Sequence, residues 1–232
     1  MKIAIMQPYL FPYIGYFQLI NAADKFIVYD DVTFIKQGWI NRNNILLNGK
    51  AFLFTVPLKD ASSYKPIREV EISADSRWKT KLLKTIEQAY KKAPYYERVV
   101  QLIEEVISAE ERLISVVALE SLKTVCSYVG IDTAIVETSS NYSNNHLQSQ
   151  ARVIDICKRE NATQYINSIG GLELYSKDAF ERENIKLSFI KSKTKSYKQF
   201  NDEFVPYLSI IDVMMFNSPD EIKEMLSQYE LV

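Results

Sequence analysis

The first 31 residues contain the pattern that most constrains the fold, because they alternate a strand, a loop, a helix and a strand. An apolar run at 3–6 is followed by an aromatic loop and a short helical segment at 17–23. A second apolar run at 25–29 ends at the acidic pair Asp30-Asp31. Two strands joined by a helix form a right-handed crossover and lie parallel. We therefore expect an α/β protein built on a mainly parallel sheet.

The rest of the chain continues this alternation, apart from one helical stretch. Asn48-Gly49 is typical of a hairpin turn. From Ser76 the apolar residues follow a helical period, and Gly130 is a suitable C-terminal cap. Strands are expected at 131–137, 163–167 and 186–190, and helices at 146–160, 175–183, 207–216 and 219–229. The pattern predicts a Rossmann-like α/β domain, residues 1–75 and 130–232, with a helical insertion, residues 76–129.

The composition excludes several classes of function. The chain has 232 residues, is 47% hydrophobic and carries a net charge of −1, so it has no broad basic surface for nucleic acid. It has one histidine, which excludes a histidine-based catalytic triad and leaves no ligand set for zinc, so we expect no metal site of this kind. No apolar run approaches the roughly 20 residues of a membrane span. We expect a cytoplasmic protein.

The turn between the first strand and its helix is the leading candidate for a binding site. Ligands of open α/β sheets lie at the carboxyl ends of strands, where helix N-termini attract phosphate. A glycine there lets the backbone approach a ligand closely. The turn resembles the H-x-G-H signature of nucleotidyltransferases and adenylating ligases, with tyrosine at both histidine positions. Phenols donate hydrogen bonds but supply no imidazolium, and an aromatic-packed turn would explain the same residues. The candidates are Gln7, Pro8, Tyr13, Gly15 and Tyr16.

Two further groups of candidates follow the second strand. Asp30 and Asp31 suit a ligand for ribose, metal or amine, although an acidic pair is also common at turns and caps. Trp39, Asn41 and Arg42 bring a stacking face, an amide and a planar cation into one loop. An arginine can bind phosphate or carboxylate in a bidentate way, and a plain surface loop is the alternative.

The remaining candidates lie in the second half of the chain. Gly170-Gly171 follows a strand and would let a phosphate or sugar pass. Arg152 and Asp212 are charged residues among apolar neighbours, so each needs a partner, either a ligand or an internal ion pair. The lysine-rich run 191–196 resembles the mobile loop of adenylating enzymes, and a solvated charge run is the favoured interpretation.

Four segments together resemble the WbqC-like family of bacterial proteins. Three of them lie at 54–57, 165–175 and 204–212. The first and most specific reads Met6-Gln7-Pro8-Tyr9-Leu10-Phe11-Pro12-Tyr13-Ile14-Gly15-Tyr16-Phe17. Members of this family tend to be encoded in gene clusters for O-antigen and other surface polysaccharides. One role proposed for them is the transfer of glycine onto an amino sugar.

The resemblance implies a mechanism when it is joined to the candidate residues. ATP and glycine would form a glycyl-adenylate, which the C4 amine of a nucleotide-linked (TDP-linked, for example) 4-amino-4,6-dideoxy sugar would attack. Asp30 or Asp31 would bind the glycine ammonium or accept a proton from the attacking amine. Arg42 and Arg152 would neutralise phosphate oxygens, and Mg²⁺ would suit a pair of aspartates near phosphates.

In the same mechanism the loop 7–16 would hold the phosphates, with Gln7 and Tyr13 donating hydrogen bonds. Three alternatives stay open. Charged glycyl-tRNA would replace ATP and glycine as the donor if the missing histidines exclude adenylate chemistry. A binding protein for sugar nucleotides would need no chemistry at all, and a nucleotidyltransferase would make the activated sugar. The sequence leaves the oligomeric state open.

Overall fold

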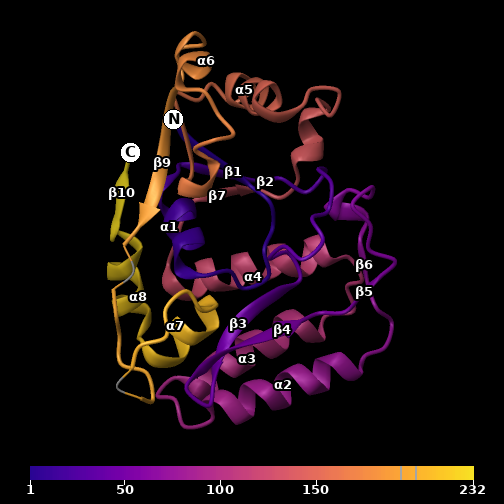
Figure 1. The fold of residues 1–232 in the computed structure, drawn as a ribbon, viewed down its shortest axis with the longest axis vertical. Coiled ribbons are helices and arrows are strands. Elements are labelled where there is room, and N and C mark those ends of the chain that lie inside the picture. Colours follow the sequence, from indigo (N-terminus) through magenta and orange to yellow (C-terminus); the bar gives the residue numbers. More distant parts are fainter. Residues whose placement is uncertain (194, 202) are drawn as a thin grey trace.

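The structure, a computed structural model, describes residues 1–193, 195–201 and 203–232, and it is a mixed α/β protein built around a six-stranded sheet (Figure 1). The strand order is β10-β9-β8-β1-β2-β7. All neighbouring pairs are parallel except β10 with β9, which confirms the predicted mainly parallel sheet. The strands are β1 (Lys2–Met6), β2 (Lys25–Val28), β7 (Ala134–Val136), β8 (Gln164–Ser168), β9 (Lys186–Ser192) and β10 (Tyr229–Leu231).

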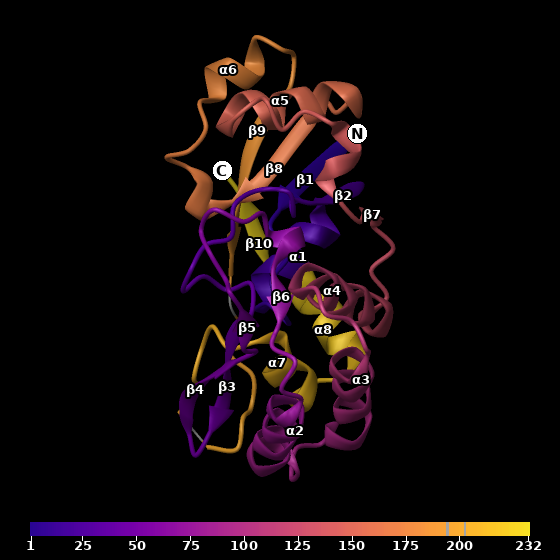
Figure 2. The ribbon, with the colours of Figure 1, turned by 90° about the vertical axis from the view of Figure 1, so that its right-hand side faces the viewer.

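Helices cover both faces of this sheet (Figure 2) because its strands alternate two sets of apolar side chains. Ala4 of β1 belongs to the cluster on the side of α1 (Ile14–Ala22) and α8 (Pro219–Leu226). Ile3 and Ile5 belong to a second cluster, on the side of α5 (Ser149–Arg159) and α6 (Lys177–Glu181). The chain reverses its direction of winding between β1 and β8, so the usual ligand position of such sheets lies at their carboxyl ends.

The other half of the molecule lies below the carboxyl ends of the parallel strands in Figure 1. Its hairpin turns at Asn48-Gly49, whose φ angles of 52° and 76° fit the predicted two-residue turn. Gly130 ends α4 with φ of 77°, as predicted for a C-terminal cap. Its elements are β3 (Arg42–Leu47), β4 (Lys50–Thr55), β5 (Leu58–Lys59), β6 (Glu71–Ile72), α2 (Arg77–Tyr90), α3 (Tyr96–Ser108), α4 (Ile114–Val129), α7 (Ile210–Phe216) and the 3₁₀ helix η1 (Ile67–Glu69). Two further 3₁₀ helices follow strands of the sheet, η2 (Ser139–Tyr142) after β7 and η3 (Ile169–Gly171) after β8.

The apolar cluster on the α1 side of the sheet continues into helices α2, α3 and α4. The division into an α/β domain and a helical insertion stays a prediction. The last strand, β10, was not predicted. The expected helix at 219–229 ends at Leu226, and the next residues pair with β9 through Tyr229 and Ser192.

Over the part of the chain described here, the helices are all too short or too polar to cross a membrane.

Candidate functional site

The backbone hydrogen-bonding groups of the loop after β1 are bound by other segments of the protein. Phe11 has a left-handed φ of 42°, and three side chains from distant segments hold its peptide groups. Its N–H donates to Ser121 Oγ at 3.0 Å, and its carbonyl accepts from Asn43 Nδ2 at 2.8 Å and from Ser209 Oγ at 2.6 Å. The Leu10 N–H donates to the Ile40 carbonyl at 3.2 Å. These N–H groups are therefore not free to bind a phosphate.

The candidates at the start of α1 divide into buried and accessible groups. Tyr16 is buried and donates its hydroxyl to the Gln7 carbonyl at 2.6 Å, and burial raises its pKa well above the usual value. A Cβ on Gly15 would lie 2.3 Å from Tyr13 Cε2, so this glycine makes room for the ring of Tyr13. Pro8 is buried, whereas Gln7 and Tyr13 are half-buried. Gln7 and Tyr13 are thus the candidates of this motif whose side chains are partly exposed.

Asp30 lies directly beyond β2, at the carboxyl edge of the sheet. Its Oδ1 accepts hydrogen bonds from Thr138 Oγ1 at 2.8 Å and from the Ser139 N–H at 3.1 Å. Among the described residues no donor reaches its other oxygen, Oδ2. Burial raises the pKa of Asp30, although the bonds from Thr138 and Ser139 act in the opposite direction. One oxygen is held in place and the other remains able to accept a proton.

Asp31 and Arg152 form an ion pair between β2 and α5. The distance from Arg152 Nη2 to Asp31 Oδ2 is 2.6 Å, and the side chains are only 4% and 8% exposed. Arg152 Nε also donates to Asn144 Oδ1 at 2.9 Å, and its guanidinium lies 4.9 Å from the centre of the Tyr29 ring. Ser139 Oγ donates to Asp31 Oδ1. Arg152 is therefore paired inside the protein. An internal ion pair was one of the two partners that the sequence left open for this residue, and a ligand was the other.

The loop candidates Trp39, Asn41 and Arg42 bind the chain around them. Arg42 donates from Nε to the Gly38 carbonyl at 2.9 Å and from Nη2 to the Gln37 carbonyl. Asn41 Nδ2 donates to the Val56 carbonyl at 2.8 Å. Trp39 is 45% exposed. In this arrangement the cation and the amide hold the loop, and the indole is the group open to solvent.

Gly170 and Gly171 lie in η3, at the carboxyl end of β8. A Cβ on Gly171 would lie 2.5 Å from Asn167 Nδ2, whereas one on Gly170 would find its nearest atom, Ser168 Oγ, at 3.9 Å. Only Gly171 is needed for close packing. Gly170 is exposed, on the same edge of the sheet as Asp30.

Asp212 is fully buried in α7, and the structure does not bring it to Asp30 or Arg152. Its Oδ1 accepts from Tyr90 at 2.8 Å, and its Oδ2 accepts from Tyr197 at 2.6 Å and from Gln199 Nε2 at 2.7 Å. Burial raises the pKa of Asp212, while these three bonds act against the increase. Within the described ranges no cation pairs with Asp212, so neutral donors hold its carboxyl group.

Sequence reasoning missed the residues that surround Asp30. Thr138, Ser139 and Asn144 lie between the expected strand at 131–137 and the expected helix at 146–160, and none of them is among the candidates. Arg68 also lies here, with its N–H on the Asp30 carbonyl at 2.9 Å and its Nη1 on Ser140 Oγ at 2.6 Å. A Thr-Ser-Ser run directly after a strand on the same edge was a usable signal, but nothing in the sequence indicates Arg68.

The described residues contain no group of three or more His, Cys, Asp and Glu side chains that could hold a metal ion.

These observations define an α/β protein with a cluster of buried charged and polar side chains at the carboxyl edge of a parallel sheet. The profile of the WbqC-like protein family matches residues 7–224, and the chain belongs to this family. It is similar to the uncharacterized protein Rv1507c of Mycobacterium tuberculosis (strain ATCC 25618 / H37Rv), with 28% identity over 228 residues, 97% of each chain. A search of solved structures gave no match.

Proposed function

We propose that this protein transfers an amino-acyl group, glycyl in the first instance, to the amino group of a nucleotide-linked 4-amino-4,6-dideoxy sugar. The reaction would serve the synthesis of O-antigen or another surface polysaccharide, in the cytoplasm. The observation that carries the proposal is Asp30, a buried carboxyl group at the carboxyl edge of the sheet, where open α/β sheets usually bind ligands. One of its oxygens is fixed by hydrogen bonds, and the other is able to accept a proton. The chain belongs to the WbqC-like family, and glycyl transfer to an amino sugar is the role that this resemblance implies.

Asp30 suits the proton transfer that amide formation requires. The sugar amine attacks the acyl carbon of a glycyl-adenylate, the N–C bond forms, the bond to the phosphate oxygen breaks and AMP leaves. The amine loses one proton, which Asp30 Oδ2 accepts. Because burial raises its pKa, Asp30 is a stronger base than an exposed aspartate. Thr138 and Ser139 orient the carboxyl group through its other oxygen.

The proposal assigns different work to Asp31 and Arg152. Since the two neutralise each other, we assign them to holding β2 and α5 in place beside Asp30. Arg68 is exposed and lies next to Asp30, so it is the cation that we assign to an anionic group of the substrates. ATP and Mg²⁺ belong to the adenylate route, and glycyl-tRNA is the alternative donor.

A binding protein for sugar nucleotides is the second candidate. The ion pair between Asp31 and Arg152 favours it, because two charged residues that the adenylate route would use are bound to each other and not available to substrates. Such a protein needs recognition by side chains such as Tyr13 and Trp39 but no base.

The test is a mass-spectrometric endpoint assay with ATP, Mg²⁺, glycine and TDP-linked 4-amino-4,6-dideoxyglucose. We expect a sugar nucleotide heavier by one glycyl unit. Asp30→Asn should reduce turnover by about 10²- to 10⁴-fold, the usual contribution of a general base, and leave the fold intact. Asp132→Asn is the matched control, since Asp132 is exposed and lies just before β7.

Two results would contradict the proposal. The first is an unchanged sugar nucleotide when folded wild-type protein is given either ATP and glycine or glycyl-tRNA. This result would identify a sugar-nucleotide-binding protein without transfer activity. Pyrophosphate release that depends on a sugar phosphate and not on glycine identifies a nucleotidyltransferase.

A further inference from the structure

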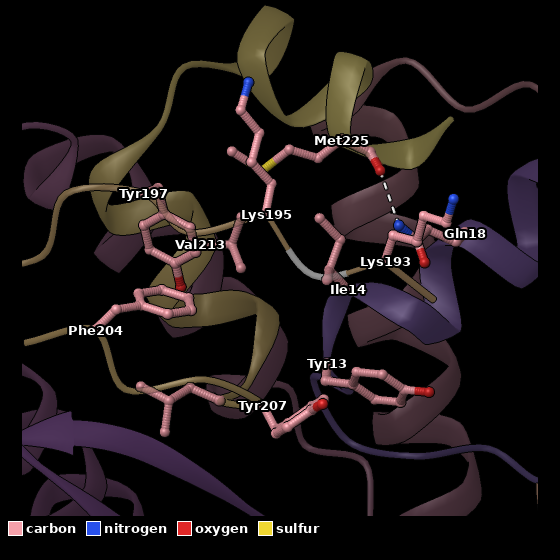
Figure 3. Close-up of a pocket in the computed structure, with 11 residues that line it drawn as sticks. Tyr13, Ile14, Gln18, Lys193, Lys195, Tyr197, Phe204, Tyr207, Val213 and Met225 are labelled. Carbon is pink, nitrogen blue, oxygen red and sulfur yellow. Dashed lines mark hydrogen bonds between the residues drawn. The ribbon is translucent and has the colours of Figure 1, made fainter. Parts of the chain in front are cut away.

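A crevice with a mainly apolar lining and a few polar and charged side chains lies at the start of α1, between this helix, the end of β9 and helices α7 and α8 (Figure 3). The crevice has a free volume of only about 20 Å³, room for one water-sized group, so any larger ligand would lie across its mouth. Tyr13 and Gln18 come from the α1 segment, Lys193 and Lys195 from the segment after β9, and Tyr207 from the segment before α7. Thr194 of the lysine-rich run lies outside the described residues.

Gln18 lines this crevice, and its side-chain oxygen is a hydrogen-bond acceptor without a described donor. The side chain is 1% exposed, and its Nε2 donates to the Met225 carbonyl at 2.8 Å and to the Gln228 carbonyl at 3.0 Å. Two carbonyl partners fix the orientation of the amide, so the other atom is the oxygen. None of the described residues donates to Oε1. A buried acceptor without a donor is costly, and a ligand N–H or O–H would satisfy it.

A second buried polar atom without a described partner lies close by. Ser192 Oγ is buried and has no hydrogen bond to a described residue. The next residue, Lys193, donates its backbone N–H to the Gln228 carbonyl at 2.9 Å, and this is one of the two carbonyls that hold Gln18. The two atoms without partners therefore belong to neighbouring segments.

The charges around the crevice favour an anion. Lys193 and Lys195 line it, and both are exposed. Lys193 Nζ lies 2.5 Å from Glu230 in an ion pair with both side chains about half exposed, and water screens such a pair, so the lysine can exchange its partner. The first turn of α1 has no acidic residue and no side-chain cap, so the positive end of its dipole is not neutralised.

We propose that this crevice binds a nucleoside diphosphate, the carrier part of the nucleotide-linked sugar. The diphosphate lies against Lys193 and Lys195, a ring of the nucleoside lies against Tyr13 or Tyr207, and a neutral N–H or O–H of the nucleoside donates to Gln18 Oε1. An ammonium group does not fit this position as well, because the two lysines repel it. The proposal rests on the proposed function for the identity of the ligand, but its test requires no transfer reaction.

The test is a calorimetric titration of the full chain with dTDP, UDP, ADP and inorganic diphosphate at fixed ionic strength. We expect at least one nucleoside diphosphate to bind about tenfold more tightly than inorganic diphosphate, because the latter lacks the nucleoside. The double variant Lys193→Gln/Lys195→Gln should weaken this binding by about tenfold or more, since it removes both charge-assisted contacts. The control is Lys191→Gln/Lys198→Gln, which removes the same charge from exposed positions outside the crevice.

A second measurement places the ligand at Gln18. In a ¹⁵N-labelled sample the side-chain amide signals of Gln18 should shift with the nucleoside diphosphate and not with inorganic diphosphate. Failure of all three nucleotides to bind folded protein at millimolar concentration overturns the proposal and leaves a water-filled crevice. Equal weakening of nucleotide binding in the two double variants also overturns the proposal. Binding would then depend on the overall positive charge of the surface and not on Lys193 and Lys195.

The results separate this proposal from the proposed function. Nucleotide binding that depends on Lys193 and Lys195, without glycyl transfer, supports the crevice and contradicts the enzyme. Glycyl transfer with an unchanged KM for the sugar nucleotide in the Lys193→Gln/Lys195→Gln variant supports the enzyme and overturns the crevice.

Discussion

At the residue scale, the ion pair of Asp31 and Arg152 makes the sharpest prediction about stability. Both side chains are nearly buried, so Arg152→Ala leaves Asp31 buried without its cation. We expect this variant to lose about 3–5 kcal/mol of unfolding free energy, measured by urea denaturation. The control is Lys158→Ala, which removes the exposed pair with Glu183 and should lower the unfolding free energy by about 1 kcal/mol or less. Similar small losses in both variants would contradict a structural role for the buried pair.

The same residues show what a sequence can indicate about a site. In the sequence Arg152 lies among apolar residues, and a charged side chain that is buried among such residues needs a partner. Asp31 was selected for another reason, its place after a strand, and the sequence did not connect the two because 121 residues separate them. Asn144 and Arg68 were missed, because a residue that acts through one long-range hydrogen bond leaves no local pattern.

At the scale of single elements, the end of α4 gives a test with few competing effects. Gly130 has φ of 77°, and the nearest atom to an added Cβ would be Lys223 Nζ at 3.7 Å, so a methyl group fits and only the backbone is strained. We expect Gly130→Ala to lower the unfolding free energy by about 1–2 kcal/mol. Gly170→Ala is the control, because its φ lies outside the left-handed region and a Cβ there has no close neighbour. Equal effects of the two substitutions would exclude backbone strain as the cause.

Elements with a strong local pattern were predicted well. The opening strand, helix and strand, the Asn48-Gly49 hairpin and the Gly130 cap depend on neighbours in the sequence, and the structure contains them all. The strand β10 depends instead on an edge that β9 leaves open, so tertiary pairing overrides the helical period of the preceding segment.

At the scale of the whole molecule, Asp212 connects distant segments and makes stability depend on pH. Its carboxyl group accepts hydrogen bonds from Tyr90 of α2, from Tyr197 and from Gln199. Burial raises its pKa above the unfolded value, so its contribution to stability is complete below the unfolded pKa and is lost as pH rises through the folded pKa. The unfolding free energy of the wild type minus that of Asp212→Asn should therefore decrease from about pH 4 upward.

Urea denaturation of both proteins in steps from pH 4 to pH 8 measures this difference, and Asp132→Asn is the control with an exposed carboxyl group. A difference that stays flat or grows with pH would show that the ionised form of Asp212 is the one the fold favours.

The position of β1 also decides when this chain can fold during its synthesis. The strand pairs with β2, which follows almost at once, and with β8, which begins at Gln164. At about 5–20 residues per second, a ribosome needs roughly 7 to 27 s to make the 136 residues from the end of β2 to the start of β8. During that time one edge of the first strand is unpaired and its apolar residues are exposed. We therefore expect the nascent chain to stay open to aggregation or chaperone binding until β8 has been made.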